Sequence, residues 1–213
     1  MTDTSANNKR IAKNTLLLYF RMLFMMAVSL YTSRVVLNAL GVEDFGIYNV
    51  VGGVVAMFSM LSGSLSAAIT RFITYELGKG NQENLKKIFS SSVTIQIGLA
   101  ILIIVVAEAI GVWFLNMKMN IPDVRITAAN WVFQFSILTF AVNLISVPYN
   151  ASIIAHERMS AFAYISILEA IGKLAIVFLI VISPMDKLIF YAILMCAVAL
   201  IVRLAYGVYC KRH

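Results

Sequence analysis

Residues Met159 to Ile182, MSAFAYISILEAIGKLAIVFLIVI, form a stretch that is long and apolar enough to cross a membrane as a helix. The stretch holds two ionisable side chains, Glu169 and Lys173, which are four positions apart and therefore share one helical face. Both lie near its middle, where a charge is costly in lipid and usually faces a bundle interior or a wet cavity. The stretch therefore predicts a membrane protein with a polar interior. The pair either only fixes helix packing or lines a path for a substrate or an ion.

The composition of the chain is typical of a polytopic membrane protein. Hydrophobic residues make up 61% of its 213 residues and charged residues 13%, against about 45–50% and about 25% in soluble domains. The net charge of +7 is scattered over short segments without a basic stripe, so we expect no nucleic-acid partner. Cys196 and Cys210 fall on one predicted helix about 21 Å apart, too far for a disulfide, and we expect no metal site.

The apolar runs predict an all-α bundle of six transmembrane helices. We expect a cytoplasmic N-terminal segment over residues 1–14, a six-helix lobe over residues 15–210 and a cytoplasmic end over residues 211–213. A tight acidic turn is expected at 41–44, and the longest loop at 71–87, where charged residues and glycines indicate exposure to solvent. The expected spans are residues 15–40, 45–72, 88–115, 126–152, 160–182 and 188–210.

Lysine and arginine residues are divided unevenly between the two ends of the predicted helices. Eleven fall on the side of the two termini or at its edge, three fall on the other side, and three lie inside the spans. Cytoplasmic segments of membrane proteins carry an excess of these residues. We therefore expect a multi-pass protein of the bacterial inner membrane with both termini in the cytoplasm.

The fourth expected span carries a polar stripe along an otherwise apolar helix. Its members are three or four positions apart and so lie on one helical face. Polar groups do not face lipid tails cheaply, so the stripe is predicted to face inward. It either forms hydrogen bonds between helices or lines a path through the protein. The members are Ser136, Thr139, Asn143, Ser146 and Asn150.

Three further ionisable residues are expected inside the spans. Arg21 and Arg34 lie in the first span about 140° apart around the helix, so they do not share a face. Arg21 is close enough to the cytoplasmic edge to reach it by snorkelling. Arg34 lies at a depth similar to that of Glu108 in the third span, and we predict a Glu108–Arg34 ion pair. The alternative is that each of the two reaches the membrane interface alone.

Four strings of the sequence resemble the polysaccharide-biosynthesis flippases of the Wzx type, which belong to the multidrug/oligosaccharidyl-lipid/polysaccharide exporter superfamily. The resemblance covers essentially the whole chain, which is similar to the N-terminal lobe of a two-lobed exporter fold. It implies transport of undecaprenyl-diphosphate-linked sugars from the inner to the outer leaflet by alternating access around a central, often cationic cavity. The strings are FGIYNVVGG (45–53), RFITYELGKG (71–80), WFLN with the following IP (113–122) and PYNASIIAHERM (148–159).

The resemblance also implies partners and site residues. Cationic cavity residues in this family often come from the first helices, so Arg21 and Arg34 become candidates for holding the diphosphate. Lys173 is the third cation, with Glu169 tuning it. The implied partners are a lipid-linked oligosaccharide, membrane lipids and a second lobe, with coupling to the membrane potential or a cation gradient and no cofactor. The candidate substrate-binding residues are Arg21, Arg34, Lys173, Glu169, Asn143, Ser136 and Thr139.

Two other functions stay open on the sequence. A cation-coupled multidrug antiporter of the same superfamily would need an acidic, cation-binding lobe, whereas these spans hold two acids against three or four bases. A structural or incomplete membrane subunit would not transport by itself. A membrane-embedded enzyme is not expected, because the outer segments are short and show no nucleophile–base constellation. Their acids are Glu43, Asp44, Asp123 and Asp186.

Overall fold

The chain folds into a bundle of helices. The computed structural model describes residues 2–119, 121–183 and 186–212, and within these ranges every regular element is a helix. Five of its helical stretches are long and apolar enough to cross a membrane, so the predicted all-α polytopic membrane bundle is confirmed. The elements are α1 (Thr2–Ala56), α2 (Ser59–Lys79), α3 (Gln82–Val106), the π-helix η1 (Ala107–Gly111), α4 (Val112–Met117), α5 (Asp123–Ala155), α6 (Met159–Ile182) and α7 (Lys187–Arg212).

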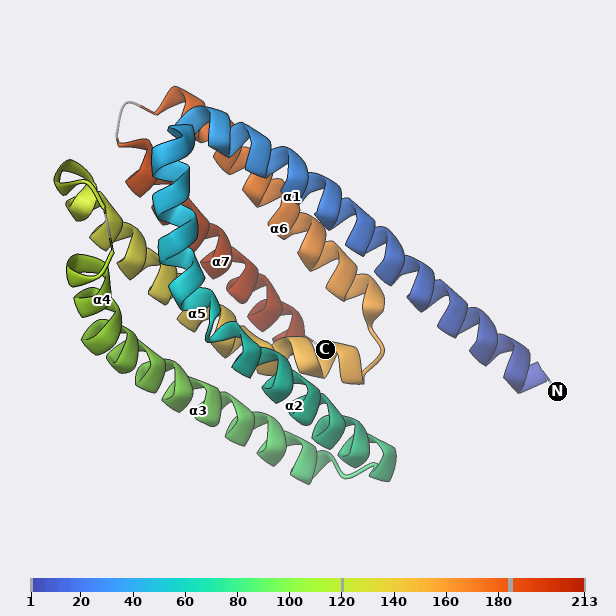
Figure 1. Cartoon of the computed structure of the whole chain (residues 1–213). Helices are drawn as coiled ribbons and strands as arrows, with labels where there is room; N and C mark the ends of the chain where they lie inside the picture. Colours follow the sequence, from blue (N-terminus) through green and yellow to red (C-terminus); the bar gives the residue numbers. More distant parts are fainter. Residues whose placement is uncertain (1, 120, 184–185, 213) are drawn as a thin grey trace.

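Both expected terminal segments continue helices that enter the bundle. α1 covers residues 1–14 from the second residue onward, and α7 covers residues 211–213 as far as Arg212. Met1 and His213 lie outside the described residues. The start of α1 and the end of α7 lie toward the same end of the bundle, away from the bend in α1 (Figure 1).

A single glycine divides α1 into two arms. Gly41 has φ 83° and ψ 170°, in the region that only glycine enters easily, and the helix resumes directly after it. The expected turn at 41–44 is therefore a sharp bend at one residue. The long arm, residues 2–40, lies beside α6, and the short arm, residues 42–56, crosses α5 and α7 (Figure 1).

The second expected span, residues 45–72, is discontinuous. It consists of the short arm and the first part of α2, with a tight turn at Met57 and Phe58 between them. The Phe58 N–H donates to the Val55 carbonyl at 3.1 Å, one residue closer than in an α-helix. α2 is not among the helices that qualify as membrane spans. The discontinuity leaves the last residues of the short arm free to line the bundle interior.

The expected long loop at 71–87 is wrong, because α2 continues to Lys79 and α3 starts at Gln82. Gly80 closes α2 with φ 69°, and the Asn81 side chain accepts a hydrogen bond from the Asn84 N–H at 3.1 Å to start α3. The loop prediction rested on charged residues. An apolar face continues beneath these charges, with Ile69 and Ile73 buried in a cluster with α3 and α5.

A π-helical turn interrupts the third expected span, residues 88–115, which is formed by α3, η1 and α4. The Phe133 side chain, from α5, packs directly against this turn and is only 1% exposed. A Cβ atom on Gly111 would lie 2.2 Å from the Phe133 ring, so any other residue there would require this buried ring to shift. The close approach anchors α5, which contacts α1, α2, α3, α6 and α7.

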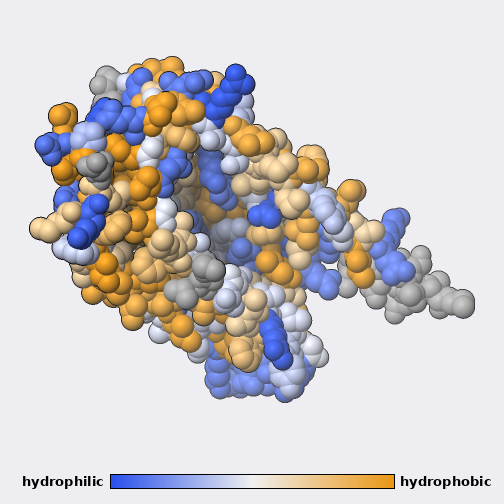
Figure 2. Space-filling model, viewed as in Figure 1, coloured by the Kyte–Doolittle hydropathy of each residue, from blue (hydrophilic) through white to orange (hydrophobic). Residues whose placement is uncertain are grey.

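The outside of the bundle is largely apolar, as expected for a surface that meets lipid. Figure 2 shows mostly hydrophobic residues over the visible face, with a hollow near its middle that holds hydrophilic residues. The hydrophobic effect cannot account for such exposure in water, whereas lipid tails cover it without cost. Apolar residues that are more than half exposed include Leu23, Leu30, Ile101, Leu102, Val105, Phe178, Val181 and Leu204.

Candidate transport cavity

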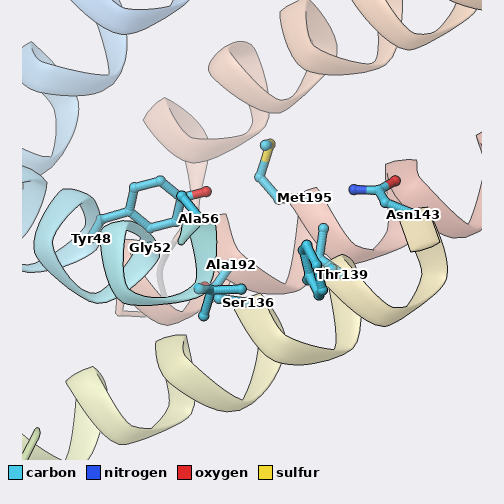
Figure 3. Close-up of a pocket in the computed structure, with 10 residues that line it drawn as sticks. Tyr48, Gly52, Ala56, Ser136, Thr139, Asn143, Ala192 and Met195 are labelled. Atoms are coloured by element: carbon cyan, nitrogen blue, oxygen red, sulfur yellow. The ribbon is translucent and has the colours of Figure 1, made fainter. Parts of the chain in front are cut away.

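Part of the polar stripe of α5 lines a cavity of about 180 Å³ between α5, the short arm of α1 and α7. Ser136, Thr139 and Asn143 point into this space, with Tyr48 on the short arm and Met195 on α7 beside them (Figure 3). The described structure therefore brings three of the predicted site residues together. We call this space the central cavity.

The remaining two members of the stripe do not line the central cavity. Ser146 is buried and donates its hydroxyl to the Val142 carbonyl at 2.8 Å, within its own helix. The Asn150 Oδ1 atom is buried and has no hydrogen-bond partner among the described residues. Helical spacing predicted the shared face, but the tilt of α5 against its neighbours decides which part of that face meets open space.

The polar groups in the central cavity keep capacity to bind a ligand. Thr139 donates its hydroxyl to the Phe135 carbonyl at 2.7 Å and keeps its acceptor lone pairs. Asn143 is exposed although it lies deep inside α5, and its amide makes no hydrogen bond to another described residue. An amide carries two donors and an acceptor, so Asn143 offers the most hydrogen-bonding capacity in the cavity.

A second cavity, of about 80 Å³, holds the ion pair of α6. Glu169 and Lys173 line it together with Thr139, Asn143 and Met195, the last three of which also line the central cavity. The two spaces are therefore adjacent. The polar stripe of α5 and the charges of α6 face one shared interior.

Glu169 and Lys173 form the ion pair that their spacing predicts. The Lys173 Nζ atom lies 2.7 Å from the Glu169 Oε1 atom, and the two side chains are 30% and 32% exposed. Neither charge is sealed in the protein. The pair places one ammonium and one carboxylate at the wall of the cavity with a net charge near zero.

Arg21 is held against α6. Its Nε–H donates to the Ser166 Oγ atom at 2.6 Å, and its guanidinium carbon lies 4.0 Å from the centroid of the Phe162 ring. Ser166 is three positions from Glu169 on the same helix, so Arg21 lies about one turn from the ion pair. Arg21 therefore contacts α6, and it lines neither of the two cavities. Snorkelling of its side chain to the cytoplasmic edge stays a prediction.

The predicted Glu108–Arg34 ion pair does not form between these two described residues. The Gln134 Nε2–H instead donates to the Glu108 Oε2 atom at 3.0 Å. Glu108 lies in η1, which faces α5, whereas Arg34 lies on the long arm, which packs on α6. Similar depth was the basis of the prediction, and the arrangement of the helices around the bundle overrules it. Arg34 is exposed and lines neither cavity.

A second group of charges was not predicted from the sequence as a unit. Arg125 at the start of α5 lies between Asp44 of α1 and Asp186, which directly precedes α7. Its Nη2 atom is 3.0 Å from the Asp44 Oδ2 atom, and its Nη1 atom is 2.7 Å from the Asp186 Oδ2 atom. We call Asp44, Arg125 and Asp186 the charge clasp. Asp44 and Asp186 were expected only as acids of the outer segments, and the occurrence of opposite charges in three segments at one end of the predicted bundle was the available signal.

The described residues contain no group of three or more His, Cys, Asp or Glu side chains that could hold a metal ion. The central cavity instead offers hydroxyl and amide groups beside apolar walls, with an ammonium in the adjoining space. Such a lining has the donors and acceptors that hydrogen bonding to polar, hydroxyl-rich or anionic groups requires.

Comparison with known proteins gives one finding. A family model described as polysaccharide biosynthesis protein matches residues 11–213, which include every residue that lines the two cavities. No curated protein and no solved structure matches the chain.

Proposed function

Because this chain belongs to the polysaccharide biosynthesis protein family, a polysaccharide-related class of membrane transporters, we propose that it is a transporter lobe that flips a lipid-linked oligosaccharide across the bacterial inner membrane. The proposed substrate is an undecaprenyl-diphosphate sugar, moved by alternating access for surface polysaccharide biosynthesis. The observation that carries the proposal is the polar cavity between helices that are long and apolar enough to span a membrane.

The chemistry of the cavity suits a sugar. Sugar hydroxyls both donate and accept hydrogen bonds, as do the amide of Asn143 and the hydroxyls of Ser136 and Thr139. The discontinuity after Ala56, which lines the cavity, supports the same conclusion. Transporters typically build midplane substrate sites from discontinuous membrane helices.

The cations near the cavity suit a diphosphate. The Lys173 ammonium stands at the cavity wall, and its ion pair with Glu169 keeps it oriented while no substrate is bound. In the proposed cycle the diphosphate competes with Glu169 for this ammonium. Arg21 lies one turn away on α6, and the exposed guanidinium of Arg34 contributes from the long arm when a second lobe approaches.

The remaining parts of the proposal concern surroundings and energy supply. We propose that both termini face the cytoplasm, that lipid covers the apolar outside, and that a second lobe completes the transport path. Coupling to the membrane potential or to a cation gradient would drive net movement. The proposed activity is transport rather than catalysis.

The test is a flipping assay in proteoliposomes with a labelled lipid-linked oligosaccharide, supplied with the second lobe. Lys173→Ala and Asn143→Ala should each slow flipping at least about tenfold, because each removes a hydrogen bond to the substrate worth about 1.5 kcal/mol or more. Lys118→Ala is the matched control, since this cation lies near the Trp113 ring outside the cavities and its loss should leave the rate unchanged.

Two outcomes would contradict the proposal. If Lys173→Ala and Arg34→Ala both leave flipping intact, the cationic groups do not hold the diphosphate. If the proteoliposomes show ion-dependent dye efflux and no movement of the lipid-linked sugar, the antiporter function replaces the proposed one.

A further inference from the structure

The charge clasp joins three segments that are distant in the sequence. Arg125 belongs to the first turn of α5, Asp44 follows the Gly41 bend of α1 by three residues, and Asp186 directly precedes α7. The planar guanidinium presents forked donors, so one arginine can hold two carboxylates in fixed directions. The Asp186 Oδ1 atom also accepts a hydrogen bond from the Leu188 N–H at 3.0 Å, which fixes this carboxylate to the start of α7.

Burial makes the clasp more than a surface contact. The Asp44 side chain is only 8% exposed, and its Oδ1 atom is buried without a hydrogen-bond partner among the described residues. Exposed ion pairs contribute little to stability, but a buried carboxylate depends strongly on its one partner. Lys187 adds a weaker link across the same bend, since its Nζ atom lies 3.4 Å from the Ala39 carbonyl oxygen.

The clasp lies on the helical face that leads into the central cavity. Asp44 is four positions before Tyr48 and eight before Gly52, and these two residues line the cavity from the short arm. About one helical turn after Asp44, the Tyr48 ring packs edge-to-face on the Tyr191 ring of α7, with centroids 4.6 Å apart. The route from the clasp to the cavity is therefore filled by side chains of α1, α5 and α7.

A fully buried apolar layer reinforces this closure. Val51 of the short arm, Val132 of α5 and Leu188 of α7 are completely buried in one cluster. Asn143 and Ala56, on the cavity side, are by contrast exposed. The central cavity is thus sealed toward the clasp and open elsewhere.

We propose that the charge clasp is a gate, which holds the central cavity closed at the clasp end and must break its ion pairs when the cavity opens there. The proposal rests on the proposed transport function, because it assigns regulation to the same cavity. Opening separates the short arm of α1 from α5 and α7, and the clasp is the set of charges that spans this separation. In the proposed orientation the clasp end faces the outside of the cell.

The experiment measures access to the cavity and needs no substrate. Cys196 and Cys210 are replaced by alanine, Ser136→Cys is the reporter inside the cavity, and a membrane-impermeant thiol reagent is added to right-side-out or inverted vesicles. Arg125→Gln and Asp44→Asn remove the clasp charges. Arg125→Lys keeps the positive charge but loses the forked guanidinium donors. Lys118→Gln is the matched control, because it removes a cation at the same end that lies outside the clasp.

In Arg125→Gln and Asp44→Asn, labelling of the reporter from the clasp end should rise at least about fivefold, the lower range of typical couplings between two conformational states. Arg125→Lys should give a smaller rise and Lys118→Gln none. Unchanged labelling from the opposite side shows that the rise is confined to the clasp end, and thermal unfolding in detergent micelles checks that each variant is folded. Asp44→Asn changes the side-chain volume little, so it decides the question if Arg125→Gln does not fold.

Unchanged labelling from the clasp end in folded Asp44→Asn and Arg125→Gln would overturn the gate and leave the clasp as a structural link. Such a result would not affect the flipping assay. Conversely, the protein could show no flipping of the lipid-linked sugar while the clasp variants still raise labelling from the clasp end. That result would count against the proposed substrate and would support the gate. The two proposals therefore fail by different measurements.

Discussion

At the scale of single residues, the Glu169–Lys173 pair illustrates why charges are retained in a membrane interior. Each side chain is about one-third exposed, so solvent screens their attraction and the pair adds little net stability. Under the proposed function, the pair keeps an ammonium available at the cavity wall, because the carboxylate balances its charge until the diphosphate of the substrate competes for it. This role needs access to the cavity, which both residues have.

Individual pairings were the least predictable part of the site. The i to i+4 spacing was sufficient for Glu169 and Lys173, because one helix sets their geometry. It was insufficient for Glu108 and Arg34, whose contact depended on how different helices are arranged around the bundle. The same dependence on tertiary structure hid the charge clasp, whose members are 81 and 61 positions apart.

The Gly111–Phe133 contact gives a prediction at the residue scale. Gly111→Ala should lower the free energy of unfolding by about 1–3 kcal/mol, because the new Cβ atom would overlap the Phe133 ring and a packed core cannot absorb it. Thermal unfolding in detergent micelles measures the effect. Gly98→Ala, in α3, is the control, since a Cβ atom there meets nothing within 4 Å. Equal behaviour of the two variants would show that α5 does not pack on the π turn.

At the scale of elements, the apolar runs of the sequence form helices as predicted, but the interruptions within these helices were not predicted. Apolar runs and a polar stripe indicate helices because both depend on a local period. The discontinuity at Met57 and Phe58 has no such local signal, since both residues are apolar and no proline lies near them. The extension of α2 to Lys79 was not predicted either. The charged residues there favoured a loop, whereas the buried Ile73 shows that an apolar helical face continues through them.

The bend in α1 gives a prediction at this scale. Gly41→Ala should destabilise the protein by about 1–2 kcal/mol, because a residue with a Cβ atom is strained at φ 83°. Gly46→Ala is the matched control: it lies in the short arm, meets nothing within 4 Å and should be neutral or stabilising by about 0.5–1 kcal/mol. Thermal unfolding of both variants decides the matter, and a stable Gly41→Ala protein would mean that α1 can straighten.

At the scale of the whole molecule, polar and apolar exposure are divided between two kinds of surface. The outside carries apolar residues, and the interior carries the hydroxyls, the amide and the ion pair around the cavities. Composition predicted the apolar outside, and the positions of the ionisable pair and the polar stripe within the apolar runs predicted the polar interior. The position of the cavity required the structure, because α1, α5, α6 and α7 each contribute only a few residues to its walls.

The most direct test compares two positions within long apolar helices that are both exposed in the isolated chain. Asn143 of α5 lines the cavities, whereas Leu102 of α3 is on the outside of the bundle. In membrane vesicles of the cysteine-free protein, Asn143→Cys should react with a water-borne thiol reagent at least about tenfold faster than Leu102→Cys, because thiolates form and meet the reagent only in water. Equal rates, or faster labelling of Leu102→Cys, would contradict a water-filled cavity inside a lipid-facing bundle.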